Sequence, residues 1–141
     1  MNLTAKTEYA CLAMLELAQH HASGEPVQVR LIAERHGIPA QFLVQILQQL
    51  KRAGMVNSIR GACGGYQLAQ APQEITLAEL LDVIEGSSDT PTCAANASPL
   101  VPVLMEVCEE LTSIQRERLE AITLADLLER AAVESDPMWY I

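Results

Sequence analysis

The sequence predicts a mainly α fold, with a two-stranded hairpin in the first half of the chain and a long helix towards the C-terminus. Three observations support this prediction. Apolar side chains recur at helical spacing through most of the 141 residues. A tight turn at Gly37 to Pro39 separates two helical stretches. The glycine-rich segment RGACGGYQLA, residues 60–69, then suits a hairpin loop. Elements in this order are typical of a winged helix-turn-helix.

The first two helices are predicted from their apolar periodicity and their ends. Residues 4–21 carry the first helix, with Thr4 as its N-cap. The segment SGEP at residues 23–26 ends it. A shorter helix over residues 29–36 stops at Gly37, because glycine readily adopts the left-handed conformation that closes a helix. The second helix and the one after the turn form the helix-turn-helix.

The third helix, over residues 40–53, is the one expected to enter the DNA major groove. Its apolar stripe comprises Phe42, Leu43, Ile46, Leu47 and Leu50. Strands over residues 55–59 and 66–68 then form the wing, which lies along the DNA backbone or the minor groove. Arg60 supplies positive charge there, and three glycines allow a tight turn and close approach. These glycines are Gly61, Gly64 and Gly65.

The second half of the chain is predicted to be helical and to pair with a second copy. A helix over residues 75–86 is capped by Thr76, with Glu79 completing a capping box. The long helix over residues 100–122 is apolar along one side, which a domain of this size cannot cover by itself. We therefore expect it to be a dimerisation helix. A last helix is capped by Thr123.

Charge is distributed unevenly along the chain. The net charge of −9, taken alone, argues against a nucleic-acid partner. Residues 1–70, however, hold six Lys or Arg against four acidic residues, a net charge of +2. Residues 71–141 hold three basic residues against fourteen acidic ones, a net charge of −11. The mildly basic first half can therefore gather its cations on one face.

Other classes of protein lack support in the sequence. Lys6, Glu8 and Glu16 interrupt the early apolar residues, so we expect no signal peptide or membrane span and a cytoplasmic location. The four cysteines form no CxxC pair, and a disulfide scaffold is not expected. No nucleophile and base pair, phosphate-binding loop or HExxH motif indicates an enzyme.

Four segments together carry a resemblance to a known family. They are MNLTAKTEYACLAMLELA, IAERHGIPAQFLVQILQQLKRAGMVNSIRGACGGYQLA, PQEITLAELLDVIEG and ITLADLL. Over essentially the whole chain they resemble the Rrf2 family of bacterial transcription regulators. The resemblance implies a homodimeric repressor on palindromic promoter sites. The expected parts are a winged helix-turn-helix DNA-binding domain (1–72), a connecting helix (73–86), a sensor-type loop (87–99), dimerisation helices (100–133) and a C-terminal tail (134–141).

The resemblance also implies which residues contact DNA. They are Gln41, Phe42 and Gln45 at the exposed start of the recognition helix, Arg60 and the glycines on the wing, and Lys51 as a further cation. Glutamine can bond adenine through two hydrogen bonds, and arginine can enter a narrow minor groove. The alternative is that Phe42 is simply core and the glutamines are solvated. Val44 stands where many relatives have glutamate, so no operator sequence is carried over.

An iron-sulfur cluster is the alternative reading of the cysteines. Several family members bind one through three closely spaced cysteines, but here the loop has Cys93 alone, and Cys108 follows fifteen residues later. A rarer arrangement joins two cysteines to a carboxylate and a histidine, and Glu8 and His36 stand at the corresponding positions. Such mixed ligation is chemically reasonable. In the competing interpretation the chain binds no cofactor. Glu8 and His36 are then ordinary residues at helix ends, and Cys108 is a small buried apolar residue.

The C-terminus and the wing carry two further hypotheses. The tail residues Met138, Trp139, Tyr140 and Ile141 are unusually apolar for a chain end. They resemble the ending of the family's cluster-free cysteine-metabolism repressor, and the tails that dock into O-acetylserine sulfhydrylase. The alternative function is thus a module whose Ile141 carboxylate docks into such an enzyme. Cys63, in the wing beside Arg60, is a candidate redox-sensitive thiol.

Overall fold

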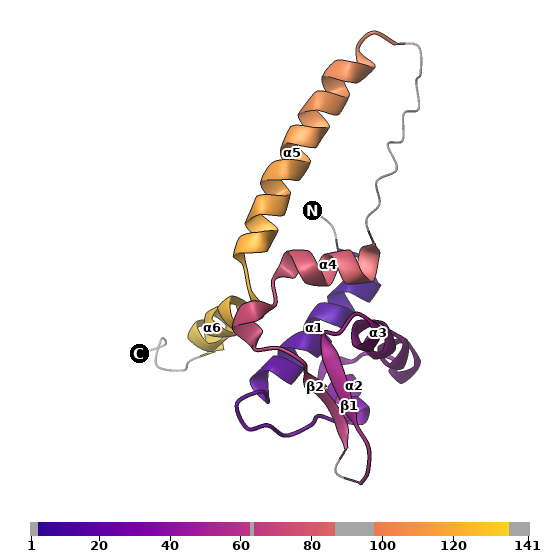
Figure 1. The fold of residues 1–141 in the computed structure, drawn as a ribbon, viewed down its shortest axis with the longest axis vertical. Coiled ribbons are helices and arrows are strands. Elements are labelled where there is room, and N and C mark those ends of the chain that lie inside the picture. Colours follow the sequence, from indigo (N-terminus) through magenta and orange to yellow (C-terminus); the bar gives the residue numbers. More distant parts are fainter. Residues whose placement is uncertain (1–2, 63, 87–97, 136–141) are drawn as a thin grey trace.

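The computed structural model describes residues 3–62, 64–86 and 98–135. The mainly α winged helix-turn-helix fold is confirmed (Figure 1). Within the described ranges the elements are α1 (Ala5–Gln19), α2 (Val29–His36), α3 (Ala40–Arg52), β1 (Val56–Ile59), β2 (Gly65–Leu68), a short 3-10 helix η1 (Pro72–Glu74), α4 (Leu77–Glu85), α5 (Val101–Ala121) and α6 (Leu124–Ser135). The predicted boundaries agree to within two residues, and only η1 was not expected.

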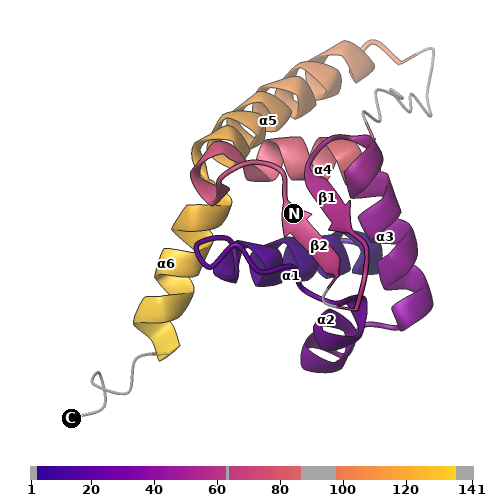
Figure 2. The ribbon, with the colours of Figure 1, turned by 60° about the horizontal axis from the view of Figure 1, so that its bottom comes forward.

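Helix α1 lies at the centre of the winged helix-turn-helix and contacts α3, α4, α6 and the wing (Figure 2). Thr4 caps it as predicted, since its side chain accepts a hydrogen bond from the Thr7 amide at 3.2 Å. Small residues such as Ala10 and Ala13 are fully buried along α1. Their size lets neighbouring helices approach closely and pack at the density of a protein interior.

The turn between α2 and α3 is closed by Gly37, whose φ of 65° lies in the left-handed region. The amides of Gly37 and Ile38 both donate to the Ala33 carbonyl, so the turn is tight. The buried stripe of α3 comprises Leu43, Ile46, Leu47 and Leu50. Placing Phe42 on this stripe was wrong, because its side chain is 57% exposed. Phe42 lies in the first turn of α3, beside the buried stripe, where the neighbouring helices do not cover it.

A buried carboxylate joins α1 to α2. Glu16 is only 2% exposed and accepts a hydrogen bond from Arg35 Nη1 at 2.9 Å. His36 Nε2 lies 3.1 Å from the other carboxylate oxygen, and His20 Nε2 lies 3.0 Å from the first. A buried carboxylate of this kind requires several partners to offset its loss of hydration. The cluster therefore fixes α2 against α1.

The wing is an antiparallel hairpin in which Val56 faces Leu68 and Ile59 faces Gly65. A backbone bridge ties the hairpin to the segment before α2, because Val27 and Tyr66 exchange two hydrogen bonds of 2.9 and 2.8 Å. Gly65 lies against this bridge at φ 155°. A Cβ atom there would collide with the Val27 carbonyl oxygen and lie 3.0 Å from the Gln28 nitrogen. The close approach thus requires glycine.

Helix α5 leaves the rest of the molecule as a long arm (Figure 1). A bridge between Thr76 and Thr123 anchors its C-terminal end. Further along, Arg116 donates two hydrogen bonds of 2.6 Å to the two oxygens of Asp82 on α4, which holds the pKa of that carboxyl below its ordinary value. No residue of α5 is buried. The expectation that Cys108 is buried was therefore wrong for the single chain, because none of the described residues covers its side chain.

Side-chain caps define the starts of α4 and α6 in the C-terminal half. The Thr76 hydroxyl accepts from the Glu79 amide at 3.2 Å, so α4 begins where predicted. At the start of α6, the Thr123 hydroxyl accepts from the Asp126 amide, and the Asp126 carboxylate accepts from the Thr123 amide at 3.0 Å. These bonds lower the pKa of Asp126. A reciprocal capping box of this kind fixes the start of a helix.

We predict that Gly65→Ala destabilises the fold more than the same change at Gly54. Gly54 also has positive φ, at 80°, but its added Cβ would meet no atom within 4 Å. Backbone strain alone should lower the free energy of unfolding of Gly54→Ala by about 1 kcal/mol. The collision in Gly65→Ala should lower it by about 2 to 3 kcal/mol. Urea unfolding followed by circular dichroism measures both values. Equal losses would show that the wing tolerates a side chain beside Val27.

Candidate nucleic-acid interface

One face of α3 presents a row of exposed polar side chains. Its members follow one another at intervals of four, three and four residues, which places them above one another on a helix. They are Gln41, Gln45, Gln48 and Arg52. The sequence prediction named the first two and missed Gln48 and Arg52, although the same spacing would have found them. Lys51, which was named, is also exposed but lies on the flank of this row.

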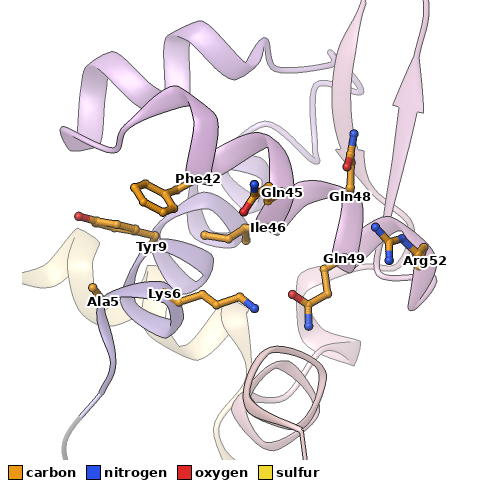
Figure 3. A pocket seen from close by; sticks show the side chains of 9 residues that line it. All are labelled: Ala5, Lys6, Tyr9, Phe42, Gln45, Ile46, Gln48, Gln49 and Arg52. Atoms are coloured by element: carbon orange, nitrogen blue, oxygen red, sulfur yellow. The ribbon is translucent and has the colours of Figure 1, made fainter.

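A cleft of about 680 Å³ opens between the N-terminal turns of α1 and the recognition helix α3 (Figure 3). As far as the structure describes the chain, its lining contains two cations, three glutamine amides, two aromatic rings and an apolar floor, but no acidic side chain. The lining residues are Ala5, Lys6, Tyr9, Phe42, Gln45, Ile46, Gln48, Gln49 and Arg52. Phe42 thus turns to the cleft, beside Tyr9, rather than into the core. Neither Lys6 nor Tyr9 was predicted to belong to a site.

The wing places Arg60 at the end of β1, with its side chain exposed. Gly61 follows at φ 110°, in a region that favours glycine, and Gly64 is packed so closely that a Cβ would collide with the Ile59 carbonyl oxygen. The Gln28 side chain donates to the Ala62 carbonyl at 3.4 Å and so links the wing tip to the start of α2. All three wing glycines therefore have a backbone reason to be glycine.

Positive charge in the first half of the chain is only partly available to a ligand. Arg35 is bound to Glu16, and Arg30 pairs with Glu34 at 3.1 Å. The other four cations make no ion pair within the described parts of the chain, and all four are exposed. They are Lys6, Lys51, Arg52 and Arg60. These four supply the positive charge that a phosphate backbone requires.

The described residues suggested for an iron-sulfur cluster do not lie together in the single chain. His36 is hydrogen bonded to the buried Glu16, while Glu8 is exposed on α1 and Cys108 is exposed on α5. Across the described ranges, no three His, Cys, Asp or Glu side chains come together as a metal site. Cys93 lies outside the described residues, as do Cys63 and the tail residues Met138 to Ile141. The hypotheses that rest on these three positions stay predictions.

Cys11 is the half-buried thiol of α1. Burial is the main reason why its pKa is raised to about 11, and the negative charges of Glu85 and Glu8 add to the effect. The thiol therefore stays protonated at neutral pH, and a protonated thiol is neither a good nucleophile nor a metal ligand.

Comparisons with known proteins agree with this geometry. The model of the Rrf2 family, described as an iron-dependent transcriptional regulator, matches residues 3–130. A helix-turn-helix-type transcriptional regulator of Synechocystis sp. is 41% identical over 129 residues, 90% of this chain and 87% of its own. The structure of T. potens IscR superposes with a TM-score of 0.82 at 35% identity, over 100% of this chain and 97% of that one.

A third match is the structure of CymR, named as the global cysteine regulator of B. subtilis. It superposes with a TM-score of 0.79 at 31% identity, and the match covers 96% of this chain and 99% of that one. Since the matched proteins are transcriptional regulators, nothing in the comparisons indicates an enzyme. No helix among the described residues is long and apolar enough to cross a membrane.

We predict that Cys11 resists alkylation in the folded protein. At pH 8, iodoacetamide should modify Cys11 at least about tenfold more slowly in the native state than in urea, because alkylation requires the thiolate that the raised pKa of this half-buried thiol suppresses. Peptide mass spectrometry at timed intervals gives both rates. Equal rates in the native and unfolded states would contradict the burial of Cys11.

Proposed function

We propose that this chain, which belongs to the Rrf2 family of DNA-binding transcription regulators, is a repressor that acts as a homodimer on palindromic promoter sites. The observation that carries the DNA-reading part of this proposal is the row of Gln41, Gln45, Gln48 and Arg52 along α3. It is the exposed face of the second helix in a helix-turn-helix, the element that such folds insert into the major groove.

The side chains of this row suit direct reading of bases. A glutamine amide can donate to and accept from the adenine edge at once, and an arginine can bond guanine through two hydrogen bonds. Arg60, on the wing, is placed to hold a phosphate or to enter a narrow minor groove. The glutamines therefore select the sequence, while Arg60 and Lys51 fix the position of the protein on the duplex.

The arm α5 supports the dimer. Its large apolar side chains form one stripe along the helix and are between 46% and 72% exposed in the single chain. They are Leu100, Val103, Leu104, Val107, Leu111 and Ile114. Monomeric proteins rarely leave so continuous an apolar surface in water. A second α5 against this stripe would cover it and present two copies of α3 to successive turns of the same face of DNA.

Repression follows from the way such a dimer occupies a promoter. Two recognition helices on a palindrome cover both half-sites, about one helical turn apart or a multiple of it. A protein held there excludes other proteins from the same stretch of DNA. The proposal thus assigns the chain a binding role, with the regulated genes defined by the operator sequence.

We predict different losses of DNA affinity for Arg60→Ala and Gln45→Ala. Arg60→Ala should weaken binding to all sequences and reduce the slope of log affinity against log salt by about 1. Gln45→Ala should cost about 1 to 3 kcal/mol, mainly at the cognate base. Fluorescence anisotropy with a promoter fragment and a scrambled duplex, at several salt concentrations, separates the two effects.

The matched control for these variants is Arg130→Ala, which removes the same type of side chain from the exposed surface of α6, away from the recognition helix and from the apolar stripe of α5. It should leave affinity and salt dependence unchanged. If Arg60→Ala and Gln45→Ala also leave promoter binding untouched, the assignment of α3 and the wing to DNA is wrong.

We also predict that Leu111→Asp separates the dimer. A carboxylate in the centre of the α5 stripe would have to be buried without a partner, which costs several kcal/mol. The wild-type protein should have about twice the 15.4 kDa mass of one chain by sedimentation equilibrium, and the variant should approach that single mass. Ser113→Asp, on another side of α5, should remain dimeric. A wild-type protein that sediments as a monomer would refute the dimer.

A further inference from the structure

The cleft between α1 and α3 has features that DNA reading does not require. Lys6 and Tyr9 come from α1, which lies outside the helix-turn-helix. The floor includes Ile46, an apolar side chain that is otherwise part of the core. Figure 3 shows the rings of Tyr9 and Phe42 at one end of the cleft and Arg52 at the other, with Lys6 and Gln49 between them. The cleft thus has an aromatic end and a cationic end.

We infer that this cleft binds a small planar aromatic anion, a molecule with a flat ring system and a carboxylate or phosphate. Its volume of about 680 Å³ lies within the range typical of small-molecule sites, roughly 300 to 1,000 Å³. Two aromatic rings beside an apolar floor favour a flat ring, which stacks on them while leaving water. The molecule binds with its ring at Tyr9 and Phe42 and its anionic group towards Arg52.

The charge of the lining determines the charge of the ligand. Lys6 and Arg52 make no ion pair within the described ranges, although the chain holds twice as many acidic as basic side chains. Among the described residues, no acidic side chain lines the cleft. An anion there gains two cationic partners and the amide donors of Gln45, Gln48 and Gln49. A cationic ligand would find no carboxylate partner, so the site selects against it.

A small molecule explains the cleft better than a DNA backbone does. A phosphate strand needs exposed cations and backbone amides, but it has no use for two aromatic rings and an apolar floor in a concave site. The base edges would be contacted by the exposed polar row of α3, not by the rings in the cleft. Tyr9 also packs against the core, but its ring and that of Phe42 together form an apolar wall that a ligand with an apolar face of its own would cover.

The ligand would control DNA binding, and this part rests on the proposed function. Gln45 and Arg52 belong both to the cleft lining and to the row that reads DNA. When the ligand engages them, they are withdrawn from the bases. Ligand and DNA therefore compete for the same two side chains, and the molecule acts as an inducer that releases the repressor.

The binding test uses 2-naphthoate and the full-length protein without DNA. The side-chain amide signals of Gln45, Gln48 and Gln49 are followed by NMR in ¹⁵N-labelled protein. Saturable shifts with a Kd of about 1 mM are expected for a fragment of this size. Tyr9→Leu and Arg52→Gln should each weaken binding about fivefold or more. Tyr9→Phe keeps the ring and should bind like the wild type. Lys51→Gln makes the same charge change as Arg52→Gln outside the cleft, and it should also bind like the wild type.

Two further probes test the two halves of the recognition. 2-Naphthalenemethanol has the ring without the charge, and inorganic phosphate has the charge without the ring; each should bind about tenfold more weakly than 2-naphthoate. If no probe causes saturable shifts, the site does not exist. If phosphate binds as well as 2-naphthoate and Tyr9→Leu changes nothing, the cleft is a simple anion site for DNA phosphates. Either result overturns the proposal.

A second measurement tests the competition. At five times its Kd, 2-naphthoate should weaken the affinity for a promoter duplex about sixfold. Tyr9→Leu protein should bind the duplex normally and lose this sensitivity. Simultaneous binding without mutual effect would refute the inducer role. The titration with 2-naphthoate contains no DNA. If the protein bound no promoter, the proposed function would be refuted, but the titration would still show whether the ligand site exists.

Discussion

The position of the recognition helix depends on one buried carboxylate. Glu16 lies on the central helix α1, and the groups that satisfy it, Arg35 and His36, are the last two residues of α2. Directly after them comes the turn at Gly37, which leads into α3. Loss of Arg35 or His36 would leave the buried Glu16 carboxylate with too few partners. Helices α1 and α2 are therefore held in one arrangement. Helix α3, the proposed recognition helix, is thus oriented through contacts to a carboxylate that is itself buried.

The wing depends on the same core through a different device. The bridge between Val27 and Tyr66 joins the hairpin to the residues that precede α2, and Gly65 permits the close contact. Helix α2 is therefore held to α1 at its C-terminal end and to the wing at its N-terminal end. The arm α5 is fixed to the same body by the Thr76 bridge and by the bidentate Arg116 pair. One rigid body can then set the relative positions of both DNA-contacting elements.

The sequence predicted local features well because local chemistry determines them. Thr4 and Gly37 mark helix ends through bonds to residues a few positions away, and these held. Phe42 and Cys108 were misjudged because helical spacing shows which residues share a face, but not whether another element covers it. Glu16 was read only as a charge that interrupts an apolar stretch. Its partners on α2 lie 19 and 20 residues away, beyond any periodic signal.

The balance of charges explains why this recognition surface is rich in amides. The four cations of the first half that make no ion pair among the described residues give only a modest counterion-driven attraction to DNA, and the acidic second half of the chain opposes it. Binding to arbitrary sequence is therefore weak. Gln41, Gln45 and Gln48 are neutral and gain little from phosphates; in the proposed complex they would form paired hydrogen bonds with the correct base and leave unsatisfied groups at a wrong one. Discrimination in such a protein depends on the amides, and a cleft ligand that engages Gln45 acts where this discrimination is made.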